Sequence, residues 1–162
     1  MSTWAGMAYV CFIVDVFSRT IVGWRVAANM RTDMVIDAVD MACFHRGTRL
    51  DGLILHSDAG SQFTSIRYTE RLADLGARPS IGTVADSYDN ALAETVNGLY
   101  KTELIHRRAP WRTVDDVELA TLSWVHWSRY AGDPSVVRSA RSGWLMWPSR
   151  RVSFDRPVTA VA

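Results

Sequence analysis

Two acidic residues, Asp58 and Glu94, stand where a protein can bind a metal ion. Asp58 follows a short apolar run, residues 53–55, which is typical of a buried strand, so the acid lies where that strand opens into a loop. Glu94 lies in a segment of helical period, outside its apolar stripe and on one face with Asn97 and Lys101. Two carboxylates on a strand end and a helix suit a hard cation such as Mg²⁺, which keeps positions for water and phosphate oxygens. The alternative is that both acids are solvated surface residues.

The residues around the two acids form two longer motifs. The first is His-Ser-Asp-Ala-Gly-Ser-Gln-Phe over residues 56–63, and the second is Tyr-Asp-Asn-Ala-Leu-Ala-Glu over residues 88–94. Thirty-five residues lie between Asp58 and Glu94. In the order and spacing of these motifs, residues 4–127 resemble the integrase core of insertion-sequence transposases, which belong to the retroviral-integrase superfamily with its Asp, Asp-x35-Glu signature.

The resemblance implies a fold, an activity and a set of partners. The fold would be α/β, with a ribonuclease-H-like mixed sheet flanked by helices. The activity would be transposition by metal-dependent DNA cleavage and strand transfer, at a site where three carboxylates hold two Mg²⁺ or Mn²⁺ ions. By motif, Asp58 is the second acid and Glu94 the third, while Lys101 and Asn90 are the implied nucleic-acid contacts. The implied partners are DNA, as element ends and target, and other copies of the chain or a full-length transposase.

One element of the family pattern has no match here. In the family, the first acid lies in a strand that precedes the stretch matching residues 3–6, and no such strand is found in this chain. We therefore expect the first, central strand of the sheet to be missing. Asp15 is the candidate substitute acid, although its place before the turn at residues 17–19 also suits an acid that accepts backbone N–H groups. Ala59 stands where a basic residue is usual in the family, and Val84-Ala85 stand where the family usually has Arg or Lys followed by Gly.

Three functional hypotheses follow from the two retained acids and the missing one. The chain is an active polynucleotidyl transferase, or it is a non-catalytic remnant that only binds DNA or a full-length transposase, or it is a plain metal-dependent nuclease of the same fold. Whether it is an enzyme is therefore left open. We expect impaired strand transfer and, because a central strand buries several large side chains, a poorly stable fold.

Composition narrows the class of protein. A chain of 162 residues with 48% hydrophobic and 22% charged residues suits one globular domain. The formal net charge is only +1, so any nucleic-acid contact must come from local basic patches. Cys11 and Cys43 have no metal-ligand or disulfide spacing and suit buried positions in a reducing compartment. With no long apolar run and no signal peptide, we expect a cytoplasmic protein without membrane contact.

The elements expected to position the site alternate between strands and helices. Helices begin after the N-caps Thr32 and Ser65, another carries Glu94, and a fourth opens with a capping box at Thr113. We expect that fourth helix to bury Val117, Ala120, Trp124 and Trp127. Strands are expected over residues 7–16, 20–27, 53–58 and 77–81, the last at an edge because it contains Pro79. Residues 1–130 would form the partial catalytic core and residues 131–162 an atypical tail, frame-shifted or disordered.

Overall fold

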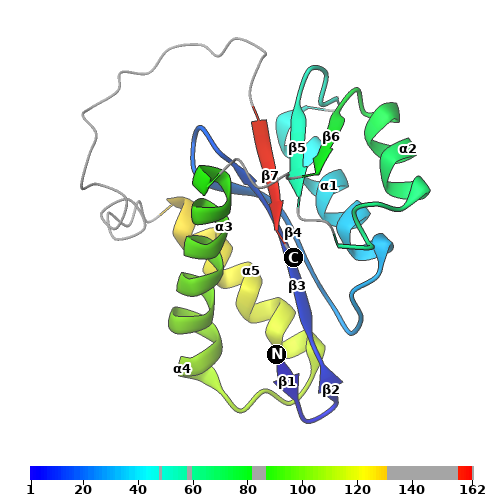
Figure 1. Cartoon of the computed structure of the whole chain (residues 1–162). Coiled ribbons are helices and arrows are strands. Elements are labelled where there is room, and N and C mark those ends of the chain that lie inside the picture. Colours follow the sequence, from blue (N-terminus) through cyan, green and yellow to red (C-terminus); the bar gives the residue numbers. More distant parts are fainter. Residues whose placement is uncertain (48, 58–59, 82–86, 131–156, 162) are drawn as a thin grey trace.

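The computed structural model describes residues 1–47, 49–57, 60–81, 87–130 and 157–161, and only the backbone of residues 81, 87–90, 129–130 and 157–161. These residues form a mixed α/β arrangement in which helices cover both faces of a sheet (Figure 1). The strands are β1 (Ser2–Thr3), β2 (Gly6–Met7), β3 (Tyr9–Asp15), β4 (Thr20–Ala27), β5 (Ile54–Ser57), β6 (Arg78–Ile81) and β7 (Pro157–Val161). The helices are α1 (Thr32–Arg46), α2 (Ile66–Asp74), α3 (Ser87–Tyr100), the π-helical turn η1 (Lys101–Ile105), α4 (His106–Arg108) and α5 (Val114–Tyr130).

The first hairpin and helix follow the sequence prediction closely. β3 and β4 pair antiparallel, with a register shift between Ile13 and Val14. α1 ends at Gly47, whose φ of 95° is a left-handed conformation that glycine adopts without strain. The predicted N-cap was one residue off, because Arg31 rather than Thr32 takes the extended conformation before the helix.

The second helix and the edge strand are also confirmed. Ser65 caps α2 by accepting a hydrogen bond from the backbone N–H of Tyr68 at 3.3 Å. Gly76, with a φ of 82°, follows the end of that helix. β6 contains Pro79 and lies at the edge of the sheet, where a missing backbone donor costs least.

The centre of the sheet was expected to lack a strand, but the structure has one there. The described strands have the order β4-β3-β7-β5-β6, so a strand does lie between β3 and β5. That strand is β7, from the C-terminal end of the chain, and it runs antiparallel to β3 and parallel to β5 (red in Figure 1). The central position is therefore filled by residues 157–161, which the sequence analysis assigned to an atypical tail, while residues 131–156 lie outside the described residues.

Each face of the sheet has its own hydrophobic core. α1 and α2 cover the face to which Cys11, Ile13 and Leu55 belong. α3, η1 and α5 cover the face to which Phe12 and Val14 belong. Since neighbouring residues of a strand point to opposite faces, β3 is buried on both sides, as its continuous apolar sequence predicts. Cys11 and Cys43 are both free and buried, as expected.

α5 confirms its predicted start but not all of its predicted core. The Thr113 hydroxyl accepts a hydrogen bond from the Asp116 N–H, and the Asp116 carboxylate accepts one from the Thr113 N–H, both at 3.1 Å. Val117, Ala120 and Trp124 are buried, but Trp127 is 44% exposed, so its prediction as a core residue was wrong. Around the axis of α5, Trp127 lies beyond the edge of the apolar stripe that faces the sheet, so its ring reaches solvent.

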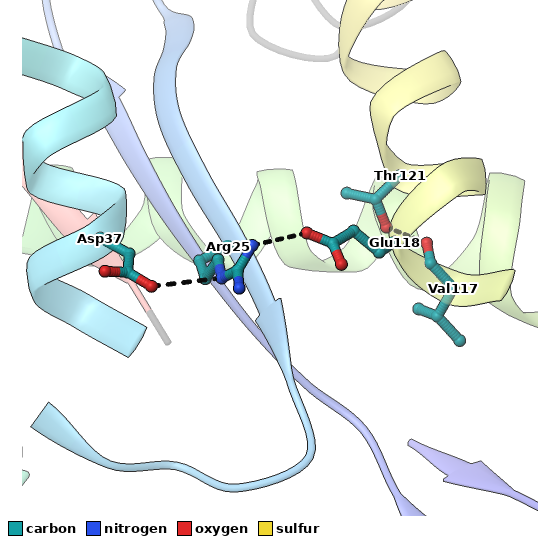
Figure 2. A network of polar contacts seen from close by, with 5 residues as sticks. All are labelled: Arg25, Asp37, Val117, Glu118 and Thr121. Atoms are coloured by element: carbon teal, nitrogen blue, oxygen red, sulfur yellow. Dashed lines mark hydrogen bonds and ion pairs between the residues drawn. The ribbon is translucent and has the colours of Figure 1, made fainter. Parts of the chain in front are cut away.

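Arg25 on the edge strand β4 joins the two helical layers. Its guanidinium lies 3.3 Å from the carboxylate of Asp37 on α1 and 2.8 Å from that of Glu118 on α5 (Figure 2). An arginine on an edge strand can reach helices on both faces because no further strand lies beside it. The Arg25 side chain is 43% exposed, so solvent screening keeps these ion pairs weak.

Candidate functional site

Glu94 lies on the outer face of α3. The helix buries Ala93, Val96 and Tyr100 against the sheet, and Leu92 and Leu99 pack partly buried beside them. Glu94 itself is exposed, as the sequence period predicts. No hydrogen bond or ion pair engages its carboxylate within the described part of the chain. The carboxylate is therefore available to a ligand.

Asp58, the other predicted carboxylate, lies outside the described residues. What the structure does show is the strand that leads to it: β5 ends at Ser57, directly before Asp58 in the chain. β5 pairs parallel with β7, and α3 packs against β7. The helix that carries Glu94 is therefore one strand away from the strand that Asp58 follows (Figure 1).

Asp15, the candidate substitute acid, is buried, and its carboxylate is hydrogen-bonded within the fold. It is 7% exposed at the end of β3. Its carboxylate accepts a hydrogen bond from the guanidinium of Arg46 at 2.7 Å and one from the backbone N–H of Phe17 at 3.1 Å. Arg46 belongs to α1, so the Asp15 side chain reaches the helical layer opposite to α3. The structure thus places Asp15 and Glu94 on different sides of the sheet.

The two predicted nucleic-acid contacts lie along α3 and its continuation. The backbone of Asn90 is in the first turns of α3, and its side chain lies outside the described residues. Lys101 is exposed at the start of η1, and no described residue forms an ion pair with it. With Asn97, Tyr9 and Met30, Lys101 lines a surface hollow of about 230 Å³. Glu94 and Lys101 are seven residues apart, or about two helical turns.

Two buried hydroxyls have no partner among the described residues, Ser57 Oγ and Tyr68 Oη. Ser57 is the last residue of β5, next to Asp58. Burial raises the pKa of Tyr68 well above its ordinary value. Burial also raises the pKa of Tyr100 to about 12, although that hydroxyl has a hydrogen-bond partner in Thr121, at 2.7 Å. Both tyrosines therefore stay protonated near neutral pH.

The described ranges contain neither a three-residue metal-binding group nor a membrane-spanning helix. No group of three histidine, cysteine, aspartate or glutamate side chains is placed to hold a metal ion. No helix there is long and apolar enough to cross a membrane.

The sequence analysis missed one exposed feature at the far end of α3. The tip of the β1–β2 hairpin presents Trp4, which is 73% exposed, beside the guanidinium of Arg112. The sequence does indicate a turn here, because Trp4-Ala5-Gly6 is a turn-like tripeptide between two short segments.

Comparisons with known proteins place these observations in a family. The model of the family described as integrase core domain matches residues 1–87. A protein of Mycobacterium tuberculosis, named as a candidate transposase for insertion sequence element IS986/IS6110, is 54% identical over 82% of this chain and 51% of its own length. The transposase for insertion sequence element IS629 of Shigella sonnei is 52% identical over 78% of this chain and 42% of its own length.

A solved structure supports the same fold. A chain of the simian T-cell lymphotropic virus intasome, in complex with PP2A regulatory subunit B56 gamma, superposes with a TM-score of 0.58 at 18% identity. The match covers 74% of this chain and 43% of the viral one. This chain spans about half the length of the curated relatives it matches. The sequence resemblance is confirmed: the chain belongs to the integrase core domain family.

Proposed function

We propose that this chain carries the catalytic-core portion of an insertion-sequence transposase, acting on DNA through Asp58 and Glu94. The observation that carries the proposal is that the two acidic motifs, residues 56–63 and 88–94, follow or lie on elements that both contact β7. Asp58 follows the carboxyl end of β5. Glu94, which is exposed and paired with no described residue, lies on a helix packed against the adjacent strand β7. Ligands of open α/β sheets bind beyond the carboxyl ends of the strands, which is where Asp58 stands in the sequence.

The proposed fold correspondence is ribonuclease-H-like. In that arrangement the central strand is antiparallel to the hairpin strand on one side and parallel to the strand that bears the second acid on the other. β7 has these two directions relative to β3 and β5. We infer that β7 stands in the place of the family's first strand, although it comes from the other end of this chain.

The donor set suits Mg²⁺ or Mn²⁺. Both ions take hard oxygen ligands and retain water, and the carboxylate of Glu94, which no described residue engages, is available to them. When bound, two such ions would supply Lewis-acid activation of the attacking oxygen and stabilisation of the leaving oxygen in phosphoryl transfer. Asp58 and Glu94 would hold the ions from the strand side and the helix side. Lys101, two turns beyond Glu94, would contact a DNA phosphate, and Asn90 would contact the nucleic acid near the start of α3.

Two carboxylates form the proposed site, and no described residue supplies a third. We assign Asp15 a structural role, because its carboxylate is engaged by Arg46 and the Phe17 N–H on the opposite side of the sheet. β7 contains no acidic residue. We therefore expect little or no strand transfer. The same observation supports a second candidate function, a fragment that binds DNA or a full-length transposase in the cytoplasm without catalysis.

Metal binding and DNA chemistry can be tested together. We expect Mn²⁺ binding, followed by its electron paramagnetic resonance spectrum, to be lost in Asp58→Asn and in Glu94→Gln. Glu70→Gln is the matched control, because Glu70 is an exposed glutamate on α2, on the other face of the sheet. Mn²⁺ binding that survives both substitutions would refute the site.

The same three variants separate the candidate functions. Strand joining of a labelled donor end that requires both acids identifies a transposase with a sufficient two-carboxylate site. Hydrolysis without joining identifies a nuclease. DNA binding without either reaction identifies the non-catalytic fragment.

A further inference from the structure

We propose that the tip of the β1–β2 hairpin and the segment after α4 form a second nucleic-acid contact, separate from the carboxylate site. In this surface Trp4 stacks on an exposed base, while Arg107, Arg108 and Arg112 bind phosphates. The inference deepens the proposed function, on which its DNA partner rests. The region lies at the lower end of the molecule in Figure 1, where the segment after α4 runs toward the β1–β2 hairpin.

The backbone of the hairpin turn is fixed to the segment that carries Arg112. The N–H of Trp4 donates to the carbonyl of Trp111 at 3.0 Å, and the N–H of Ala5 donates to the carbonyl of Arg112 at 3.1 Å. The guanidinium of Arg112 lies over the Trp4 ring, 5.9 Å from its centroid. Ring and cation are therefore held together before any ligand arrives, which lowers the entropy cost of binding.

Trp111 anchors this segment to the core. Its ring is buried, and its Nε1 donates a hydrogen bond to the carbonyl of Ile105 at 3.2 Å. By contrast, Trp4 is 73% exposed. A large aromatic ring left in water at a turn tip, beside an anchored cation, is the arrangement that bases stack on.

The chain segments that form the proposed surface contain arginines and no acidic residue. Residues 104–114 contain three arginines and no acid, and residues 1–14 contain no acid either. Arg107 and Arg108 are exposed and form no ion pair with any described residue. The acids that flank this segment in sequence are Glu103 on one side and Asp115 and Asp116 on the other. The Glu103 carboxylate accepts a hydrogen bond from Trp124 Nε1 at 2.9 Å, and Asp116 is occupied by the capping box in the first turn of α5. A chain of net charge +1 thus carries three arginines close together in sequence, and none of them forms an ion pair with a described residue, which suits phosphate binding.

The experiment measures DNA affinity of the full chain in EDTA, by fluorescence anisotropy with labelled single-stranded and duplex oligonucleotides at several salt concentrations. We expect Trp4→Ala to weaken single-strand binding by roughly tenfold and Trp4→Phe to restore most of it, because a phenyl ring still stacks. We expect Arg107→Ala/Arg108→Ala to reduce the salt slope by about two, while Trp4→Ala leaves the slope unchanged.

The control variant is Arg78→Ala, an exposed arginine on the edge strand β6, which should change neither affinity nor slope. Equal losses in the alanine and phenylalanine variants of Trp4, or tighter binding of duplex than of single strand, would overturn the stacking role. Unchanged binding in all variants would overturn the surface. Competition by polyglutamate as effective as that by DNA would show that the surface takes an acidic protein instead.

The result is distinguishable from that of the proposed metal site. Trp4→Ala and Arg107→Ala/Arg108→Ala should weaken DNA binding in EDTA, where no metal ion is bound, and should keep full Mn²⁺ binding. Loss of Mn²⁺ binding in Trp4→Ala would show that the two regions are not independent.

Discussion

The central strand β7 provides the sharpest test of this structure. Thr159 pairs with Val14 of β3 on one side and with His56 of β5 on the other. A strand paired on both sides uses its N–H groups in the ladders, and proline cannot donate one. We therefore predict that Thr159→Pro detaches β7, while Thr159→Val, which keeps a β-branched residue, does not.

The expected cost follows from what β7 covers. A ladder acceptor left without its donor costs about 1–3 kcal/mol. Phe12, Ile13 and Val14 of β3 are 0% exposed beside β7, and full burial of such side chains is worth about 1.5–3 kcal/mol each. If detachment partly exposes each of these three side chains, their lost burial and the unpaired acceptor together cost about 3–6 kcal/mol. That is a large part of the free energy of unfolding of a domain. For a chain of this size the melting temperature should then fall by roughly 10 °C or more.

The assay is thermal unfolding by circular dichroism, combined with amide hydrogen exchange. In Thr159→Pro, we expect faster exchange in peptides covering residues 12–15 and 54–56, which pair with β7. Mn²⁺ binding should weaken as well, because β7 separates β5 from α3 and sets their spacing. An unchanged melting temperature and unchanged exchange in Thr159→Pro would show that β7 does not hold the centre of the sheet.

Three further predictions concern packing, pH and surface charge. Gly23→Ala should lower the free energy of unfolding by about 1–3 kcal/mol in urea denaturation, because the added methyl group would overlap the backbone carbonyl of Ala38, where α1 crosses β4; unchanged stability would contradict the close packing. The pKa of Tyr100 is about 12 in the folded state and 10.0 in the unfolded reference, so the unfolded chain loses this proton first and stability should fall as pH rises from 10 to 12. Urea denaturation across that range should show a shallower fall in Tyr100→Phe, and an equally steep one would contradict the assignment. Arg25→Ala should change the free energy of unfolding by no more than about 1 kcal/mol, since its two ion pairs are half-exposed (Figure 2); a larger loss would show that the network is stronger than its exposure implies.

Local signals in the sequence were sufficient for most elements of the core. Ser65 and Thr113 were predicted as caps, because each acts through bonds within a few residues of itself. The same is true of Glu94, whose exposure follows from the helical period alone. The family was likewise readable from the two acidic motifs and their spacing.

Non-local contacts decided the rest. The sequence of residues 157–161 does not show that they belong between β3 and β5, because strand partners are chosen by packing across the whole sheet. The role of Asp15 depended on Arg46, thirty-one residues away, which reaches it only because α1 packs on that face. The pairing of Trp4 with Arg112 depended in the same way on the hairpin lying against the segment before α5. Sequence alone determined the chemistry that the chain can offer, and the tertiary structure determined which of those groups meet.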